Sequence, residues 1–147
     1  MQQIDLQTNT HALPGTVEAY WYKGENPEDE RTLFHRITIP LQEFNCDIAN
    51  KRQPVSTEIV FDWYELGLGD IYDLHGQNLR LEDYAESEAF ILFGDTHHWC
   101  EVKQLAFEKS GKDSFIVTGE LVIEFENAEF AQNETFNFKT TVNVLRR

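Results

Sequence analysis

Hydrophobic and polar residues alternate along the C-terminal third of the chain. In FIVTGELVIEF (115–125) every odd position is apolar or glycine, and the even positions include Thr118, Glu120 and Glu124. TFNFKTTVNV (135–144) repeats the alternation, with Phe, Val and one Thr on one side and Asn, Lys and Thr on the other. A period of two over this length is typical of antiparallel strands with one solvent-exposed face.

A third strand-like segment, WCEVKQLAFEK (99–109), comes before these two but changes phase. Its Cys and first Val lie at even positions, whereas its Leu and Phe lie at odd positions. One extra residue would restore the phase, so we predict a β-bulge near Gln104. We expect a tight hairpin turn at 110–113, with Gly111 at positive φ, and a longer connection at 127–133. The three segments therefore predict a meander.

The N-terminal part carries weaker signals of the same kind. Four further segments have strand-like alternation or a short apolar run: 16–23, 33–39, 55–63 and 88–93. Two short helices are expected between strands, one over 41–51 and one over 79–87 with Asn78 as its N-cap.

Many strands and few short helices predict an all-β, mainly antiparallel fold. We expect a β-sandwich or barrel that ends in the three-strand meander and has one or two short helices. The length of 147 residues predicts a single globular domain over 1–147. An aromatic content of 13% separates the chain from disordered sequences.

The charge of the chain is strongly acidic and unevenly distributed. The net charge is −14, and the segment 58–101 holds eleven acidic residues against a single base, Arg80. Nucleic acids and anionic membranes are recognised by basic patches, so neither is an expected partner. The imbalance instead predicts a basic protein partner.

The cysteines and the N-terminus predict a cytoplasmic location. Residues 1–15, MQQIDLQTNTHALPG, have neither the basic nor the apolar region of a signal peptide. Cys46 and Cys100 are too few for a disulfide framework. We therefore expect two buried, reduced thiols.

DTHHWC (95–100) is the strongest candidate for a metal or catalytic site. His97 and His98 are adjacent, so on a strand their side chains point to opposite faces. Further ligands would have to come from elsewhere, such as Asp73 or His75, and none of the usual zinc-ligand spacings is present. We therefore interpret the stretch as a turn into a strand.

That interpretation has consequences for the individual side chains. It places a turn at 94–95 and expects a buried Trp99 together with a hydrogen-bonded histidine. It also predicts no metal and no cofactor. His97, His98, Asp73 and His75 remain only weak metal candidates.

The segment DWYELGLGDIYDLHGQNLRLEDY (62–84) is the preferred binding surface. It is rich in acids, aromatics and glycine, lacks a regular period, and does not match the EF-hand order of ligands. Ordered aromatic-rich loops are often functional, and aromatic residues are enriched at interfaces. The predicted partner-binding residues are Asp62, Trp63, Tyr64, Glu65, Asp70, Tyr72, Asp73, Glu82, Asp83 and Tyr84.

Three functions are compatible with these patterns, in decreasing order. The first is a non-enzymatic acidic module that docks a basic partner, such as an immunity-type inhibitor of a toxin or nuclease. The second is a small-molecule-binding barrel or sandwich, suggested by the inward parity of Phe115, Phe125, Phe136 and Phe138.

The third function is a metal-dependent enzyme that uses DTHHWC. No nucleophile signature and no phosphate-binding loop is present in the sequence, so we lean away from an enzyme. A monomer or an edge-to-edge homodimer is expected, because the long strands of the meander could pair between chains.

Overall fold

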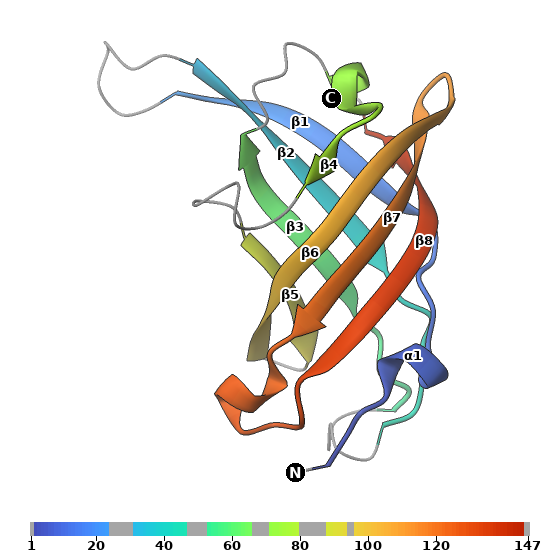
Figure 1. Cartoon of the computed structure of the whole chain (residues 1–147), viewed down its shortest axis with the longest axis vertical. Helices are drawn as coiled ribbons and strands as arrows, with labels where there is room; N and C mark the ends of the chain where they lie inside the picture. Colours follow the sequence, from blue (N-terminus) through green and yellow to red (C-terminus); the bar gives the residue numbers. More distant parts are fainter. Residues whose placement is uncertain are drawn as a thin grey trace.

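Seven strands of the protein form a closed barrel in a computed structural model (Figure 1). The structure describes residues 2–23, 31–46, 53–65, 71–79, 88–93 and 96–145. The barrel order is β6-β5-β3-β2-β1-β8-β7, and β7 pairs back to β6. The strands are β1 (Gly15–Lys23), β2 (Arg31–Pro40), β3 (Glu58–Glu65), β5 (Glu88–Phe93), β6 (Thr96–Gly111), β7 (Ser114–Ile123) and β8 (Glu134–Val144).

The barrel is mixed at a single junction. The β1–β8 pair is parallel, whereas the other pairs around the barrel are antiparallel. This confirms the all-β, mainly antiparallel prediction, and of the two architectures expected the chain adopts the barrel. Closure also gives β6 and β7 neighbours on both sides, which removes their free edges as surfaces for strand pairing between chains.

Short elements lie at the two ends of the barrel (Figure 1). At the lower end in that view are α1 (Leu6–Asn9) and the 3₁₀ turn η4 (Phe125–Ala128). At the upper end are the 3₁₀ turn η2 (Ile71–Leu74) and the two-residue strand β4 (Asn78–Leu79), which pairs with β6.

The predicted meander is present. Its register shift lies where the alternation of β6 changes phase, as predicted. The β6–β7 pairing is irregular between Val102 and Gln104, which is the expected bulge. Two details are wrong. Strand β7 ends at Ile123, so that Phe125 lies in η4, and Gly111 is not at positive φ. The described glycine with positive φ is Gly76, at 84°.

Both predicted helices are wrong wherever the structure describes them. Leu41 and Phe44 have helical spacing, but they form isolated β-bridges, to Ala12 and Val55. Both are buried, so the spacing indicated burial and not helix. Asn78 and Leu79, the predicted N-cap and first residue of the second helix, both belong to β4. The remainder of these two segments, 47–51 and 80–87, lies outside the described residues.

The interior of the barrel is filled by side chains of alternate strand positions. The phenylalanines predicted to point inward are buried: Phe115, Phe125, Phe136 and Phe138. Gly119 lies opposite Phe138 across the β7–β8 pair, and a Cβ atom at Gly119 would come within 2.4 Å of that ring. Glycine in the middle of β7 leaves room for the Phe138 ring, which would have to move if position 119 carried a side chain.

The N-terminal segment completes the lower end, because β1 pairs with β8 over three residues only, at the far end of β8. The carboxylate of Glu134 accepts the backbone N–H groups of Asp5 and Leu6, at 3.0 and 2.7 Å. The side-chain amide of Gln7 donates to the carbonyl of Asn137 and accepts from its N–H group. These bonds attach the segment before β1 to the N-terminal half of β8, and they hold the buried Leu6 in the core.

Candidate functional site

The outer wall of β3, β5 and β6 carries a line of apolar and aromatic side chains. Val60 lies opposite Phe90, and Phe90 lies opposite Trp99, so the three residues cross the wall from strand to strand. Leu92 lies opposite His97 in the same antiparallel β5–β6 pairing. The inward positions of these strands face the core, so these five residues point outward. We call Val60, Phe90, Leu92, His97 and Trp99 the outer patch.

Ring contacts give the outer patch a defined shape. The Phe90 ring lies edge-on to His97 and to Trp99, with centroids 4.7 and 5.9 Å apart. Trp99 is 47% exposed and Leu92 is 38% exposed. The patch is built on paired strands, so these side chains are presented by a rigid backbone.

A groove of about 870 Å³ opens beside the outer patch. Val60, Phe90 and Leu92 line it on the barrel side. Its other side is formed by 40–43 and by 54–58, two segments that the Leu41 N–H to Thr57 carbonyl bond connects. The volume falls within the range of clefts that enclose small ligands or a few side chains.

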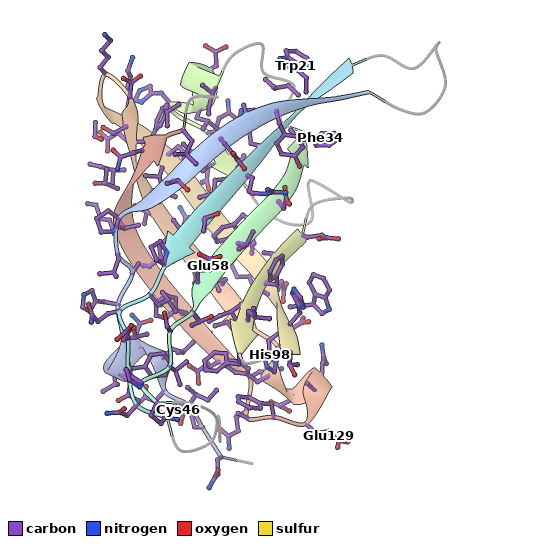
Figure 2. All side chains as sticks on the ribbon, turned by 180° about the vertical axis from the view of Figure 1, so that it is seen from behind. Trp21, Phe34, Cys46, Glu58, His98 and Glu129 are labelled. Atoms are coloured by element: carbon purple, nitrogen blue, oxygen red, sulfur yellow. The ribbon has the colours of Figure 1, made fainter. Side chains whose placement is uncertain are left out.

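Exposed carboxylates surround the outer patch and the groove. Glu43 and Glu58 line the groove, Glu88 begins β5, and Glu101 follows Trp99 by two residues. Figure 2 shows this wall from the front, with Glu58 at the start of β3. The ammonium of Lys103 lies 2.8 Å from the Glu101 carboxylate, so this one nearby base is already engaged. The wall therefore combines apolar contact area with negative charge.

Asp62 was predicted to contact a partner, but its carboxylate is buried in an internal network. The Arg36 guanidinium donates to it at 2.8 and 2.9 Å, and the Tyr20 hydroxyl donates at 2.8 Å. Arg36 also lies 3.4 Å from Glu18. Burial and the bond to Asp62 raise the pKa of Tyr20, and the same carboxylate raises the pKa of Arg36. Asp62 therefore joins neighbouring strands of the wall.

The other predicted partner-binding residues are described only in part. Asp73 lies exposed in η2. For Trp63, Tyr64, Glu65 and Tyr72 the structure describes the backbone alone. Asp70, Glu82, Asp83 and Tyr84 lie outside the described residues. The predicted surface over 62–84 therefore stays a prediction.

DTHHWC enters a strand, as the preferred interpretation stated. Strand β6 begins at Thr96, with His97 and Trp99 outward and His98 and Cys100 inward. Two expectations are wrong: Trp99 is half exposed, and the ring of the buried His98 has no hydrogen bond in the part of the chain that the structure describes. Neither ring nitrogen of His98 has a partner among the described residues, although the side chain is only 1% exposed. The preceding turn, 94–95, lies outside the described residues.

His98 lies in an aromatic box at the lower end of the barrel (Figure 2). Its ring centroid is 4.9 Å from both Phe125 and Phe130 and 6.0 Å from Phe93. Burial lowers the pKa of His98, and the nearby His97 lowers it further. The imidazole is therefore held neutral in surroundings that disfavour a charge.

The weak metal candidates are not brought together. His75 accepts the backbone N–H of Lys109 at 2.9 Å, near the opposite end of β6 from His98. Eleven residues of extended strand separate the two histidines by roughly 35 Å. Among the residues that the structure describes, no three His, Cys, Asp or Glu side chains are grouped as metal ligands.

Both cysteines are free and buried. Cys100 lies next to His98 in sequence, and its thiol donates weakly to the His98 carbonyl at 3.8 Å. Burial, together with the nearby Glu124, raises the pKa of Cys100 to about 12. A thiol with this pKa is almost entirely protonated at neutral pH and is a poor nucleophile.

The outer patch was missed at the sequence level, although a signal for it exists. In EAFILF (88–93) the inward positions are Ala89, Ile91 and Phe93, but the alternate positions Phe90 and Leu92 are also apolar. A strand with one solvated face should carry polar residues there. Apolar residues at both parities of an outer strand therefore mark a face that is available for contact.

These features define a small acidic barrel with an aromatic outer wall. No protein-family model matches the chain, and neither the curated proteins nor the solved structures show a similar one. The function is therefore argued from the wall itself. In the described part of the chain, no helix has the length and apolar character needed to cross a membrane.

Proposed function

We propose that this barrel is a non-enzymatic, acidic protein-binding module that docks a basic partner. The single observation that carries the proposal is Trp99, which lies half exposed against Phe90 and is surrounded by carboxylates. Tryptophan dominates binding energy at many interfaces when a partner covers it. An immunity-type inhibitor of a toxin or nuclease fits this description.

The charge of the protein supports a basic partner. Glu58, Glu88 and Glu101 lie on the same wall as the outer patch, and the whole chain carries −14. Carboxylates around an apolar centre speed the encounter with a basic surface and orient it. The apolar centre then supplies most of the affinity, because burial of apolar surface is the dominant favourable term in most protein–protein association. Two free thiols favour a partner in the reducing cytoplasm.

The filled interior weakens the second candidate, a small-molecule carrier. The phenylalanines that suggested a ligand cavity are core residues with little or no exposed surface. A ligand would therefore bind on the outer wall and not inside the barrel. The closed barrel likewise favours a monomer over an edge-to-edge dimer.

The proposal is tested with a double variant, Leu92→Ser/Trp99→Ser. Leu145→Ser is the matched control, because Leu145 is an equally exposed apolar residue, at 47%, beside β1 and not on the wall. Proteins that bind the tag-free wild type and the control, but do not bind the double variant, are identified by mass spectrometry. Each is then purified and its dissociation constant is measured.

A basic protein is expected, with affinity reduced at least tenfold in the double variant and unchanged in the control. Its association should slow as salt rises, because the attraction between opposite charges is screened. A folded double variant that retains every ligand of the wild type would overturn the proposal.

A further inference from the structure

The groove beside the outer patch is continuous with it. Val60, Phe90 and Leu92 belong to both. A partner that covers the whole outer patch therefore also contacts the groove lining at these shared residues. The part of the partner that continues past Trp99 must either enter the groove or leave its apolar lining exposed.

The lining of the groove selects a particular chemistry. Leu13, Leu41, Val60, Phe90 and Leu92 provide apolar surface. Among the described residues that line the groove, the charged ones are Glu43 and Glu58, and both are acidic and exposed. A complementary ligand has an aliphatic group for the lining and a cation beside it.

The backbone around the groove is already hydrogen-bonded. Ile59 pairs with Ile91 in the β3–β5 ladder, and Leu41 donates its N–H to the carbonyl of Thr57. The Thr57 hydroxyl in turn donates to the carbonyl of Leu92. A ligand is therefore recognised through its side chains and not by adding a strand to the sheet.

We infer that the groove holds an extended segment of the basic partner. One aliphatic side chain of that segment enters the groove, and a flanking lysine or arginine lies against Glu43 and Glu58. This inference rests on the proposed function and specifies the partner's chemistry at the same wall. The groove volume suits a few side chains, whereas a whole helix is about 10–12 Å across.

Three capped hexapeptides test the inference on the intact protein. One alternates lysine and leucine, one alternates lysine and serine, and one alternates glutamate and leucine. Binding is followed by the backbone amide shifts of Val60, Phe90 and Leu92 in ¹⁵N-labelled protein. The lysine–leucine peptide is expected to bind at least tenfold more tightly than the other two and to shift these amides.

Charge variants localise the binding. Glu43→Gln/Glu58→Gln should weaken the lysine–leucine peptide about three- to tenfold, because two exposed charge pairs are lost. Glu108→Gln/Glu120→Gln removes the same charge from β6 and β7, away from the groove, and should change affinity less than twofold. Equal affinity of the three peptides, or shifts that map elsewhere, would contradict the inference.

Two further results separate this inference from the proposed function. If Leu92→Ser/Trp99→Ser loses the partner but Glu43→Gln/Glu58→Gln retains it, the wall is the interface and the groove assignment is wrong. If decylammonium shifts the groove amides whereas no peptide does, the groove binds a small amphipathic amine, and the peptide assignment is again wrong. Loss of both partner and peptide in Glu43→Gln/Glu58→Gln supports the groove.

Discussion

The two faces of the β5–β6 hairpin use similar residues for opposite purposes. His98 faces inward into a box of phenylalanines, whereas His97, one residue earlier, faces outward beside Phe90 and Trp99. Each face therefore joins histidine with aromatic rings. The inner face stabilises the fold through burial, and the outer face leaves its aromatic surface for a partner.

The comparison shows that composition alone does not separate core from interface. Inside, Phe93, Phe125 and Phe130 contact one another around His98, which is only 1% exposed. Outside, Phe90, His97 and Trp99 also contact one another, but Trp99 remains half exposed. Hydrophobic stabilisation scales with the area removed from water, so substitutions on the two faces should differ strongly in their effect on stability.

The largest difference is expected between Phe125→Ala and Trp99→Ala. The inner substitution opens a cavity in a filled core and should lower the free energy of unfolding by about 3–5 kcal/mol. The outer substitution should cost less than about 1 kcal/mol, because half of the Trp99 surface is already in water. Urea denaturation measures both, and comparable losses would show that the outer wall is also part of the core.

The next effect concerns His98 and pH. Since its pKa is lowered in the folded state, the unfolded chain takes up a proton first as pH falls below about 6.5. Stability should then fall by up to about 1.4 kcal/mol per pH unit until the folded pKa is reached. His98→Leu should lack this component and be about 1–2 kcal/mol more stable at pH 7, because two unpaired nitrogens are removed.

The control for His98 is its neighbour. His97→Leu should retain most of the loss of stability between pH 7 and pH 5, since burial is the larger cause of the lowered pKa. Thermal or urea unfolding of the three proteins over this range isolates the histidine from the many carboxylates they share. Parallel curves for wild type and His98→Leu would contradict the assignment.

An effect of similar size is expected from the ion-pair network on the outer wall. Asp62→Asn keeps the shape of the side chain but removes the charge that Arg36 and Tyr20 bind, and should destabilise the fold by about 1–2 kcal/mol. Asp73→Asn is the matched change at an exposed acid and should have no measurable effect. Equal stability of the two variants would show that the Asp62 network does not support the wall.

The smallest effect on stability is expected from a substitution that places two adjacent cysteines on opposite faces of β6. Glu101→Cys places a thiol outward, next to the inward Cys100, and should leave the free energy of unfolding nearly unchanged. A disulfide reagent at pH 8 should label residue 101 at once, whereas Cys100 should react more than about a hundredfold more slowly. Rapid labelling of Cys100 would place it on the solvent side.

The local sequence pattern was sufficient to predict strands that have one solvent-exposed face. The meander and the bulge near Gln104 follow from alternation, because a pleated strand turns successive side chains to opposite faces. Local pattern was misleading at Leu41 and Phe44, where helical spacing reflected two separate buried bridges. There, contacts with distant segments outweighed the local preference.

The sequence by itself determined that this protein is an acidic, mainly antiparallel all-β chain, and that His97 and His98 point apart. Both properties depend only on charge and on the period of a strand. The tertiary structure decided that the strands close into a barrel, that Asp62 is engaged by Arg36, and that Trp99 lies exposed in the outer patch. These outcomes depend on which distant strands become neighbours, because a side chain's burial and partners come from the strand beside it.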